Sequence, residues 1–500
     1  MLFKPWPKNP IIYEINTWVW LHDLSQRYNK AITLATIPPD ELDGIAEVPV
    51  DAVWFMGVWE RSPAGILIGR AHAGLQAESR RVLPEFSPTD LVGSPYSVHR
   101  YLVDEHLGGP GGLAAVRERL AGRGIRLVLD FVPNHVAVDH RWVLQRPEYL
   151  VQGEPDDLER APDDFFQAGG KVFAHGRDPH FPPWTDVAQL DGFNPGLRQA
   201  SMETLRHIAA QCDGVRCDMA MLLVNRIFAQ TWGKHGGEVS PLEFWPEMIQ
   251  SIRAKYPNFL FVAEAYWGME RELQQQGFDY CYDKRLYDRL VHETAESVRR
   301  HLTADVAYQE KLIRFIENHD ERRAAVAFHL QRSRAAALTT SALPGAKLFH
   351  EGQFEGRRVK LPVQLGRRPA EPTDWDLRDF YRRLLKEISS SVFRDGEWQL
   401  CDSRGWPEND SYLNLAAWCW RHEDERRLIV VNLSDAGAQG RIHLPWNDLA
   451  GRSWRLVDAF SGEIYDRAGD EMTDLGLYVD LNPWGFHFLS LDERSTLICR

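Results

Sequence analysis

The sequence predicts a (β/α)8 TIM barrel that is interrupted after its third strand by an inserted segment and followed by an antiparallel β-sandwich. Residues 11–353 alternate short apolar runs with longer helical stretches. The runs are almost continuously apolar, as in parallel strands that are buried on both faces. The last hundred residues lose the helical stretches and show short runs separated by turn residues, which is typical of an antiparallel sandwich.

The elements of the barrel follow one another in a regular order. The expected strands are residues 11–20, 52–58, 125–133, 214–219, 259–265, 278–282, 312–318 and 346–350. The expected helices are residues 112–123, 195–211, 241–255, 269–276, 284–302, 321–333 and 374–391. A doubly wound open sheet is the alternative, but its first strand would lead into a Gly-rich phosphate turn, and no G-x-G-x-x-G motif follows here.

Two segments do not alternate in this way. Residues 136–194 are rich in Asp, Gly and Pro and lack clear periodicity, which in a compact domain indicates a functional excursion. The expected sandwich strands are residues 413–420, 427–432, 440–444, 454–458 and 485–491. The domain organisation that follows is a barrel of residues 1–135 and 196–394, an insertion of residues 136–195, and a sandwich of residues 395–500.

The composition restricts the partners and the location. The 58 Lys and Arg against 71 Asp and Glu give a net charge of −13, which argues against a nucleic-acid or anionic-membrane partner. The chain shows neither a signal peptide nor 18 unbroken apolar residues, so we expect a cytoplasmic protein whose six Cys are reduced thiols. The 18 Trp fit either core packing or platforms that stack on sugar rings. The oligomeric state stays open.

Polar residues gather where the expected barrel strands end. They are Asp130, Asn134 and His135 after the third strand, Arg216 and Asp218 on the fourth, Glu264 on the fifth, and Asn318, His319 and Asp320 after the seventh. In this fold the carboxyl ends of all strands meet at one mouth. A single polar residue at a strand end is ordinary, but several buried charges together are costly unless they are paired or functional.

These segments resemble a known family. DFVPNH, GVRCDMAML, FVAEAYW and FIENHD, in this order, are similar to the signature regions of the α-amylase family (glycoside hydrolase family 13). GSPYSVHRY and LPGAKLFHEGQ resemble two further segments of that family. The resemblance covers nearly the whole chain, with residues 136–195 in the place of the family's domain B. It implies an enzyme that cleaves α-glucosidic bonds with retention of configuration.

The resemblance also implies roles for individual residues. Asp218 would be the catalytic nucleophile, Glu264 the catalytic acid/base, and Asp320 the third carboxylate that binds sugar hydroxyls. The implied substrate-binding residues are Tyr96, His135, Arg216 and His319. Tyr96 would stack on the reacting sugar and the two His would bind its hydroxyls, while Arg216 would keep Asp218 charged and aimed. Asp130 and Asn134 would brace the third strand and the insertion.

Two departures from the family pattern matter. The family often carries Lys-His three and four residues after the nucleophile, where this chain has Met221 and Leu222. A typical calcium ligand is thereby lost, and of the family's ligands only Asn134 and an acidic residue of the insertion would remain. No cofactor is therefore expected to be required, calcium is doubtful, and no metal ligands are assigned. Arg100 stands where the family commonly has Asp. It would contact either an anionic group on the substrate or a carboxylate of a surface loop.

Aromatic residues are expected around the mouth. The long loop 57–95, with its segment 59–65, and the run 180–184 would wall a pocket, which favours short α-glucosides over starch. The residues expected to stack on sugar rings are Trp54, Trp59, Tyr96, Trp184, Tyr266 and Trp267.

The leading hypothesis is a retaining α-glycosidase that acts on an α-linked glucoside or oligosaccharide through a covalent glycosyl–Asp intermediate. Transglycosylase, glycoside phosphorylase and isomerase activities of the same family remain open, as does endo or exo action. A non-catalytic amylase-like binding domain would lack at least one of the three carboxylates, and all three are present. A barrel with unrelated metal chemistry would carry clustered ligands such as H-E-x-x-H, which the sequence does not contain.

Overall fold

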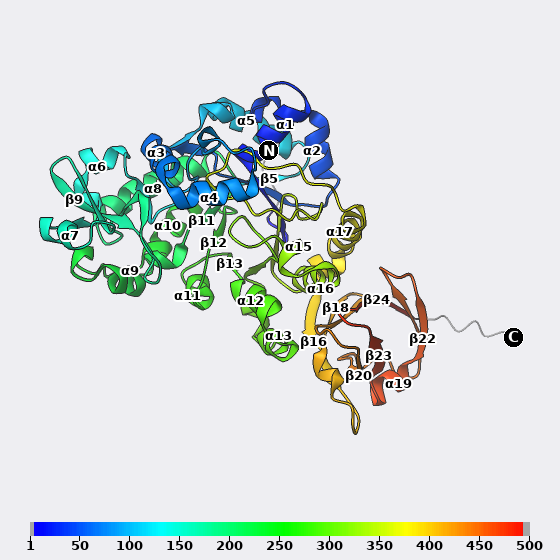
Figure 1. The fold of residues 1–500 in the computed structure, drawn as a ribbon. Helices are drawn as coiled ribbons and strands as arrows, with labels where there is room; N and C mark the ends of the chain where they lie inside the picture. Colours follow the sequence, from blue (N-terminus) through cyan, green and yellow to red (C-terminus); the bar gives the residue numbers. More distant parts are fainter. Residues whose placement is uncertain (1–4, 494–500) are drawn as a thin grey trace.

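The computed structural model describes residues 5–493, and its centre is a closed barrel of eight parallel strands in the order β1-β15-β14-β13-β12-β11-β5-β2 (Figure 1). The strands are β1 (Ile11–Asn16), β2 (Ala52–Met56), β5 (Arg126–Phe131), β11 (Gly214–Cys217), β12 (Leu260–Ala263), β13 (Tyr280–Tyr282), β14 (Leu312–Arg314) and β15 (Ala346–His350). Each lies within one of the expected runs. Most of their residues are buried, which explains why the runs are apolar throughout. The predicted fold class is confirmed.

The first strand is shorter than expected. Residues 17–20 were predicted to continue it, but they open helix α1 (Thr17–Arg27). The cause is local, because the Asn16 side chain accepts a hydrogen bond from the Val19 N–H at 3.3 Å and so caps the helix. The apolar side chains of Val19 and Trp20 are therefore buried as part of this helix and not as part of a strand.

Helices surround the barrel and differ from expectation in two places. The main ones are α5 (Gly109–Ala121), α8 (Pro195–Ala209), α10 (Phe244–Arg253), α11 (Glu270–Gln275), α12 (Lys284–His292), α13 (Ala295–Leu302), α16 (Leu330–Ser341) and α17 (Trp375–Ile388). The single helix expected over 284–302 is divided into α12 and α13. The prediction of one helix over 321–333 is wrong. Only the short helix α15 (Ala324–Ala327) forms there, and α16 begins after His329. The φ of His329 is 57°, which lies outside the helical region and separates the two helices.

The segment 57–95 is not an open loop. It contains the short strand β3 (Trp59–Arg61), helix α3 (Pro63–Ala71) and helix α4 (Ala73–Val82). Ser62 begins α3 by accepting the Gly65 N–H at 2.7 Å, and Pro63 occupies the first helical position that proline favours. This rim segment is therefore built from regular elements.

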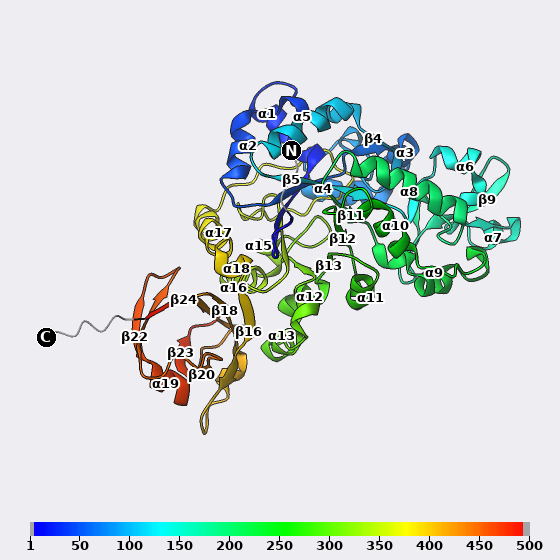
Figure 2. The ribbon, with the colours of Figure 1, turned by 180° about the vertical axis from the view of Figure 1, so that it is seen from behind.

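The insertion between β5 and α8 has its own sheet and core. Its strands are β6 (His135–Ala137), β7 (Gln152–Gly153), β8 (Phe165–Ala168), β9 (Lys171–Gly176) and β10 (Trp184–Gln189), with helices α6 (Arg141–Gln145) and α7 (Pro155–Arg160). The sheet order is β6-β10-β9-β7, with β8 also paired to β9. A cluster that includes Val136, Phe173 and Leu190 forms its core. Figure 2 shows the insertion on one side of the barrel.

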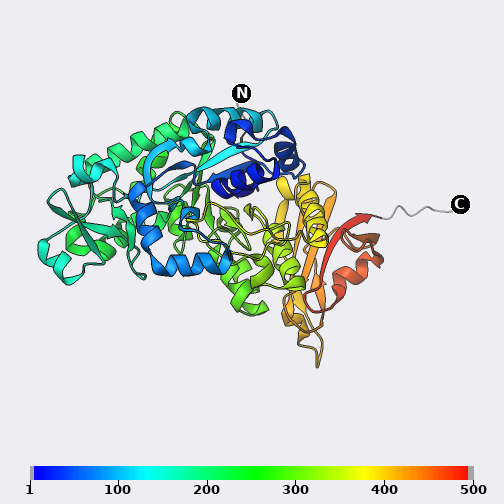
Figure 3. The same ribbon diagram turned by 45° about the horizontal axis from the view of Figure 1, so that its top comes forward.

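The C-terminal strands lie on the other side of the barrel (Figure 3). A six-stranded antiparallel sheet contains β16 (Glu397–Leu400), β18 (Leu415–His422), β19 (Glu425–Asn432), β24 (Phe486–Glu493), β21 (Ser453–Asp458) and β22 (Ile464–Ala468). A three-stranded sheet contains β17 (Asp402–Arg404), β20 (Ala438–His443) and β23 (Leu477–Leu481). Trp418 and Trp420 are buried and donate from their indoles to the Ala342 carbonyl at 3.0 and 2.8 Å. These two hydrogen bonds connect the sandwich to the barrel domain.

Within residues 5–493, no helix combines the length and the apolar character needed to cross a bilayer. The exact domain boundaries expected from the sequence stay a prediction.

Candidate active site

Asp218 and Glu264 lie side by side at the carboxyl end of the barrel. They directly follow β11 and β12, whose last residues Cys217 and Ala263 are paired in parallel register. Both carboxylates are buried, with 5% and 2% of each residue exposed. The two carboxylates assigned from the sequence as nucleophile and acid/base are thus neighbours in space, as their strands require.

Arg216 bridges the two carboxylates. Its Nη1 lies 2.6 Å from Asp218 Oδ1 and its Nη2 lies 2.8 Å from Glu264 Oε2. The guanidinium is buried and is covered by the rings of Trp54 and Tyr96, whose centroids lie 5.4 and 5.1 Å away. A buried cation held between two anions offsets part of their desolvation cost and fixes the orientation of both. The contact with Asp218 agrees with the sequence prediction, whereas the contact with Glu264 was not foreseen.

Glu264 accepts hydrogen bonds that favour its ionised form, whereas its burial favours the protonated form. The Tyr266 hydroxyl donates to Oε1 at 2.8 Å and the Met219 N–H donates to Oε2 at 2.6 Å. Burial raises the pKa of Glu264 to about 7, against the opposing charge of Arg216. A carboxyl group with this pKa is present in both protonation states near neutral pH, as a general acid/base requires.

His319 connects a second group of polar side chains. Its Nε2 lies 2.9 Å from Asp320 Oδ2 and 2.7 Å from the Tyr96 hydroxyl, and its Nδ1 lies 2.5 Å from Glu14 Oε1. Burial alone would lower the pKa of His319, but the negative charges of Asp320 and Glu14 raise it to about 10. The imidazole is therefore charged at neutral pH and can donate from both nitrogens.

Asp320 is the most accessible of the three carboxylates. Its side chain is 42% exposed. Desolvation would raise the pKa of Asp320, but the charged His319 beside it lowers the pKa well below its usual value. A carboxylate that stays ionised and open to the mouth is able to accept hydrogen bonds from sugar hydroxyls.

Glu14 is a member of this group that the sequence reasoning missed. It lies on β1, is fully buried, and its Oε2 has no hydrogen-bond partner among residues 5–493. The signal was a single charge inside the apolar run IIYEIN, because a buried carboxylate requires a cationic partner. Glu14 fixes the charge of His319, and through His319 the position of Asp320.

Replacing Glu14 with Gln should lower kcat/KM for an aryl α-glucoside about tenfold, by analogy with the hydrogen-bond partners of metal-ligating His, whose loss costs about 10–100-fold. The amide keeps the size of the side chain but removes one of the two negative charges that stabilise the imidazolium, the other being that of Asp320, so the pKa of His319 should fall. Kinetics combined with NMR titration of the imidazole nitrogens would measure both effects. An unchanged His319 titration would contradict the role given to Glu14.

His135 and Tyr96 complete the cluster expected from the sequence. The His135 ring packs against Trp184 with a centroid separation of 5.3 Å, and its Nδ1 lies 3.2 Å from Asn134 Nδ2. Burial lowers the pKa of His135, so this ring is neutral, unlike His319. All seven predicted site residues therefore lie at the same mouth, although their roles are not established by position alone.

Two tryptophans predicted to face the sugar are instead part of the core. Trp54 and Trp59 are each 1% exposed. Their indoles donate to Asp130 Oδ1 at 3.2 Å and to the Asp130 carbonyl at 2.8 Å, and the Gly57 N–H donates to Oδ2 at 2.8 Å. The prediction that they form stacking surfaces is wrong. Asp130, whose pKa burial raises to about 6, braces this part of the barrel, as predicted.

The accessible aromatic residues lie further out on the rim. Trp267 is 41% exposed and Phe181 is 65% exposed. The His180 ring meets the Trp267 ring edge-on at 4.8 Å, which links the insertion to the loop after β12. The run 180–184 is thus placed beside the mouth, whereas Trp59 is not part of the wall.

Arg100 forms an exposed ion pair with Glu60, in which Nη2 lies 2.7 Å from Oε1. Of the two contacts considered from the sequence, the structure shows the one with a carboxylate of a surface segment.

The residues present do not fit a calcium site. Met221 and Leu222 are buried apolar side chains. The Asn134 Oδ1 accepts from Gln189 Nε2 at 3.1 Å, so this remaining family ligand is already bonded. Among residues 5–493, no three His, Cys, Asp or Glu side chains gather at a spacing suited to a metal ion.

Comparison with known proteins relates the chain to α-amylases. No family model matches it. An α-amylase of Haloarcula japonica is 23% identical over 369 residues, which are 71% of this chain and 45% of that protein. An α-1,4-glucan:maltose-1-phosphate maltosyltransferase of Bifidobacterium longum is 27% identical over 204 residues, 39% of this chain and 23% of that protein. The chain thus spans less than half the length of these two relatives.

Solved structures share the whole fold. A maltogenic α-amylase from Thermotoga neapolitana superposes with a TM-score of 0.69 at 18% identity, covering 97% of this chain and 98% of the other. An α-amylase from Geobacillus thermoleovorans, complexed with acarbose, gives a TM-score of 0.67 at 16% identity, covering 98% and 100%. The resemblance to the α-amylase family, first seen in the four motifs, is confirmed by the sequence relatives, and the barrel with its C-terminal sandwich is the fold of these enzymes.

Proposed function

We propose that this protein is a retaining α-glycosidase that acts on α-glucosidic bonds. The observation that carries the proposal is the pair of Asp218 and Glu264 on neighbouring strands, bridged by Arg216. Retaining glycosidases need two carboxyl groups close together, one ionised and one able to give and take a proton. The burial of Glu264, which raises its pKa to about 7, supports its role as the group that gives and takes the proton.

The proposed reaction has two steps. Asp218 Oδ attacks the anomeric carbon while Glu264 transfers its proton to the leaving glycosidic oxygen, so that a glycosyl ester forms as the glycosidic bond breaks. Glu264, now ionised, takes a proton from the acceptor, whose oxygen displaces Asp218 and restores both carboxyl groups. Asp320 and the charged His319 would hold the sugar hydroxyls, and binding them is expected to help the ring to distort toward the transition state.

Transfer to an acceptor other than water is the second candidate. It is favoured by the similarity to a protein named as a maltosyltransferase, and it uses the same intermediate. A product screen would decide between them: maltose, longer maltooligosaccharides, sucrose and trehalose are each offered with water, a second sugar or inorganic phosphate as acceptor. Products that are all shorter than the substrate indicate hydrolysis, oligosaccharides longer than the substrate indicate transfer, and a sugar phosphate indicates phosphorolysis. Cleavage of none of these glucosides would contradict the proposed substrate class.

Removal of metal ions should leave the protein active. Because Met221 and Leu222 fill the position of a typical ligand and Asn134 is bonded to Gln189, incubation with a chelator should change neither the rate on an aryl α-glucoside nor the melting temperature. Activity assays and thermal unfolding before and after dialysis against the chelator would measure this. A loss that added calcium restores would show that a metal is required.

A further inference from the structure

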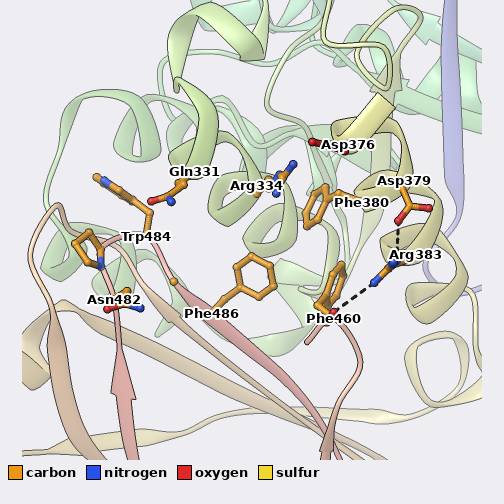
Figure 4. A pocket seen from close by; sticks show the side chains of 12 residues that line it. Gln331, Arg334, Asp376, Asp379, Phe380, Arg383, Phe460, Asn482, Trp484 and Phe486 are labelled. Atoms are coloured by element: carbon orange, nitrogen blue, oxygen red, sulfur yellow. Dashed lines mark hydrogen bonds and ion pairs between the residues drawn. The ribbon is translucent and has the colours of Figure 1, made fainter. Parts of the chain in front are cut away.

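A second cleft lies between the barrel and the C-terminal sandwich (Figure 4). It is about 510 Å³ in volume, within the roughly 300–1,000 Å³ typical of small-ligand sites. Its walls are α16, α17, Phe460 from the end of β21, and the turn 482–486 that leads into β24. The lining shares no residue with the cluster around Asp218 and Glu264. The cleft is therefore separate from the candidate active site.

Aromatic rings form the base of this cleft. Phe380, Phe460 and Phe486 pack on one another, with centroids 5.3 Å apart for Phe380–Phe460 and for Phe460–Phe486, and 6.1 Å apart for Phe380–Phe486. The Arg383 Nη1 donates to the Phe460 carbonyl at 3.3 Å, and its Nε lies 2.9 Å from Asp379 Oδ2. These contacts between α17 and the sandwich hold the base of the cleft in place.

Trp484 stands at the edge of the cleft in a backbone conformation that is rare for a bulky residue. Its φ is 54°, in the left-handed region. Its N–H donates to the Ser434 carbonyl at 3.0 Å, and the Arg332 guanidinium lies 4.8 Å from the indole centroid. The backbone hydrogen bond and the contact with Arg332 thus hold the indole at the edge of the cleft.

The polar side chains of the cleft are available to a ligand. No hydrogen bond or ion pair to the rest of residues 5–493 engages the side chains of Gln331, Asp376 and Asn482. Within the described part of the chain, the Arg334 side chain makes only a ring contact, with its guanidinium 5.7 Å from the Phe380 centroid. Together they offer amide, carboxylate and guanidinium groups next to aromatic surface. The two Arg and two Asp in the lining balance one another, so the lining carries no net charge.

We propose that this cleft binds an uncharged α-glucan chain at a distance from the catalytic carboxylates. A sugar ring has an apolar face that packs on aromatic side chains and a rim of hydroxyls that donate and accept hydrogen bonds. The cleft offers both kinds of partner and no net charge. The choice of an α-glucan, among neutral sugars, rests on the proposed function. Binding there would retain a long substrate while one of its bonds is cleaved at the barrel mouth.

Electrophoresis in native gels that contain glycogen tests this proposal, because a protein that binds glycogen migrates more slowly in such gels. The variants are made in the Asp218→Asn background so that glycogen is not degraded. Trp484→Ala should weaken the apparent affinity for glycogen about tenfold, as loss of an aromatic anchor does, and Trp484→Phe should restore most of it. Trp406→Ala, which removes another tryptophan of the sandwich that is 42% exposed, should bind like the parent. With Asp218 restored, Trp484→Ala should cleave an aryl α-glucoside at the normal rate.

Equal retardation of Trp484→Ala and the parent would overturn the proposal, and so would an absence of retardation of the parent. Thermal unfolding checks that the variant folds; if it does not, Arg334→Ala and Gln331→Ala replace it, and unchanged binding in both would overturn the proposal equally. The outcome is separable from the proposed function. If the protein cleaves aryl α-glucosides but its retardation by glycogen does not depend on Trp484, only this inference is contradicted. If the retardation depends on Trp484 but the protein cleaves no aryl α-glucoside, only the proposed function is contradicted.

Discussion

Replacing Asp218 with Asn should lower turnover of an aryl α-glucoside at least about 10⁴-fold, because a neutral amide cannot form the glycosyl ester on which the proposed reaction depends. The shape of the side chain is kept, and Arg216 retains its contact with Glu264. The fold should therefore persist. Steady-state kinetics together with thermal unfolding would distinguish a loss of chemistry from a loss of structure.

A matched control is Glu60→Gln, which removes a carboxylate at the rim. Its partner Arg100 is exposed, and an exposed ion pair contributes little, so activity should remain near that of the wild type. Substantial turnover by a folded Asp218→Asn variant would contradict the assignment of the nucleophile.

Replacing Glu264 with Gln should slow hydrolysis of maltooligosaccharides by about 10²–10⁴-fold, the usual effect of losing a general acid/base. The formation of the intermediate should be much less affected for an aryl glucoside whose leaving group departs without protonation. Because burial raises the pKa of Glu264 to about 7, its acid form is lost as the pH rises through that value. The kcat/KM of the wild type for maltooligosaccharides should therefore fall above about pH 7.

The pH profile separates Glu264 from other groups. In Glu264→Gln the alkaline fall centred near pH 7 should disappear, leaving a low rate that changes little across that range. Tyr266→Phe is the matched conservative variant: it removes the hydroxyl that donates to Glu264 Oε1 and should shift the alkaline limb without abolishing it. A wild-type limb that persists unchanged in Glu264→Gln would show that another group provides the proton.

The barrel could be predicted from the sequence because its strands are buried on both faces and are therefore apolar along their whole length. The end of the first strand could not be predicted, because the change from β1 to α1 depends on a helix cap formed by Asn16 and not on hydrophobicity. The helices of segment 57–95 were also missed, although Ser62 followed by Pro63 is a recognisable helix start. In the sandwich, β16, β17, β22 and β23 were also missed, because they are short and many of their residues are exposed.

Those residues of the candidate site that lie within contiguous sequence motifs could be predicted. Arg216 and Asp218 lie two residues apart, and the register of β11 and β12 brings Glu264 beside them. Glu14 joins His319 across 305 residues of sequence, and such a pairing leaves no local pattern. Whether Trp54 lies in the core or faces the mouth depends in the same way on its hydrogen bond to Asp130, which lies 76 residues away in the sequence. Long-range hydrogen bonds decided which charged and aromatic residues are functional surface and which are core.

The stereochemistry of the first product tests the central claim most directly. NMR spectra recorded immediately after the enzyme is mixed with an α-glucoside would show which anomer of the released sugar appears before mutarotation. Attack by Asp218 followed by attack of water inverts the anomeric carbon twice, so the account predicts that the α anomer forms first. Initial release of the β anomer would mean a single displacement by water and would contradict a covalent intermediate on Asp218.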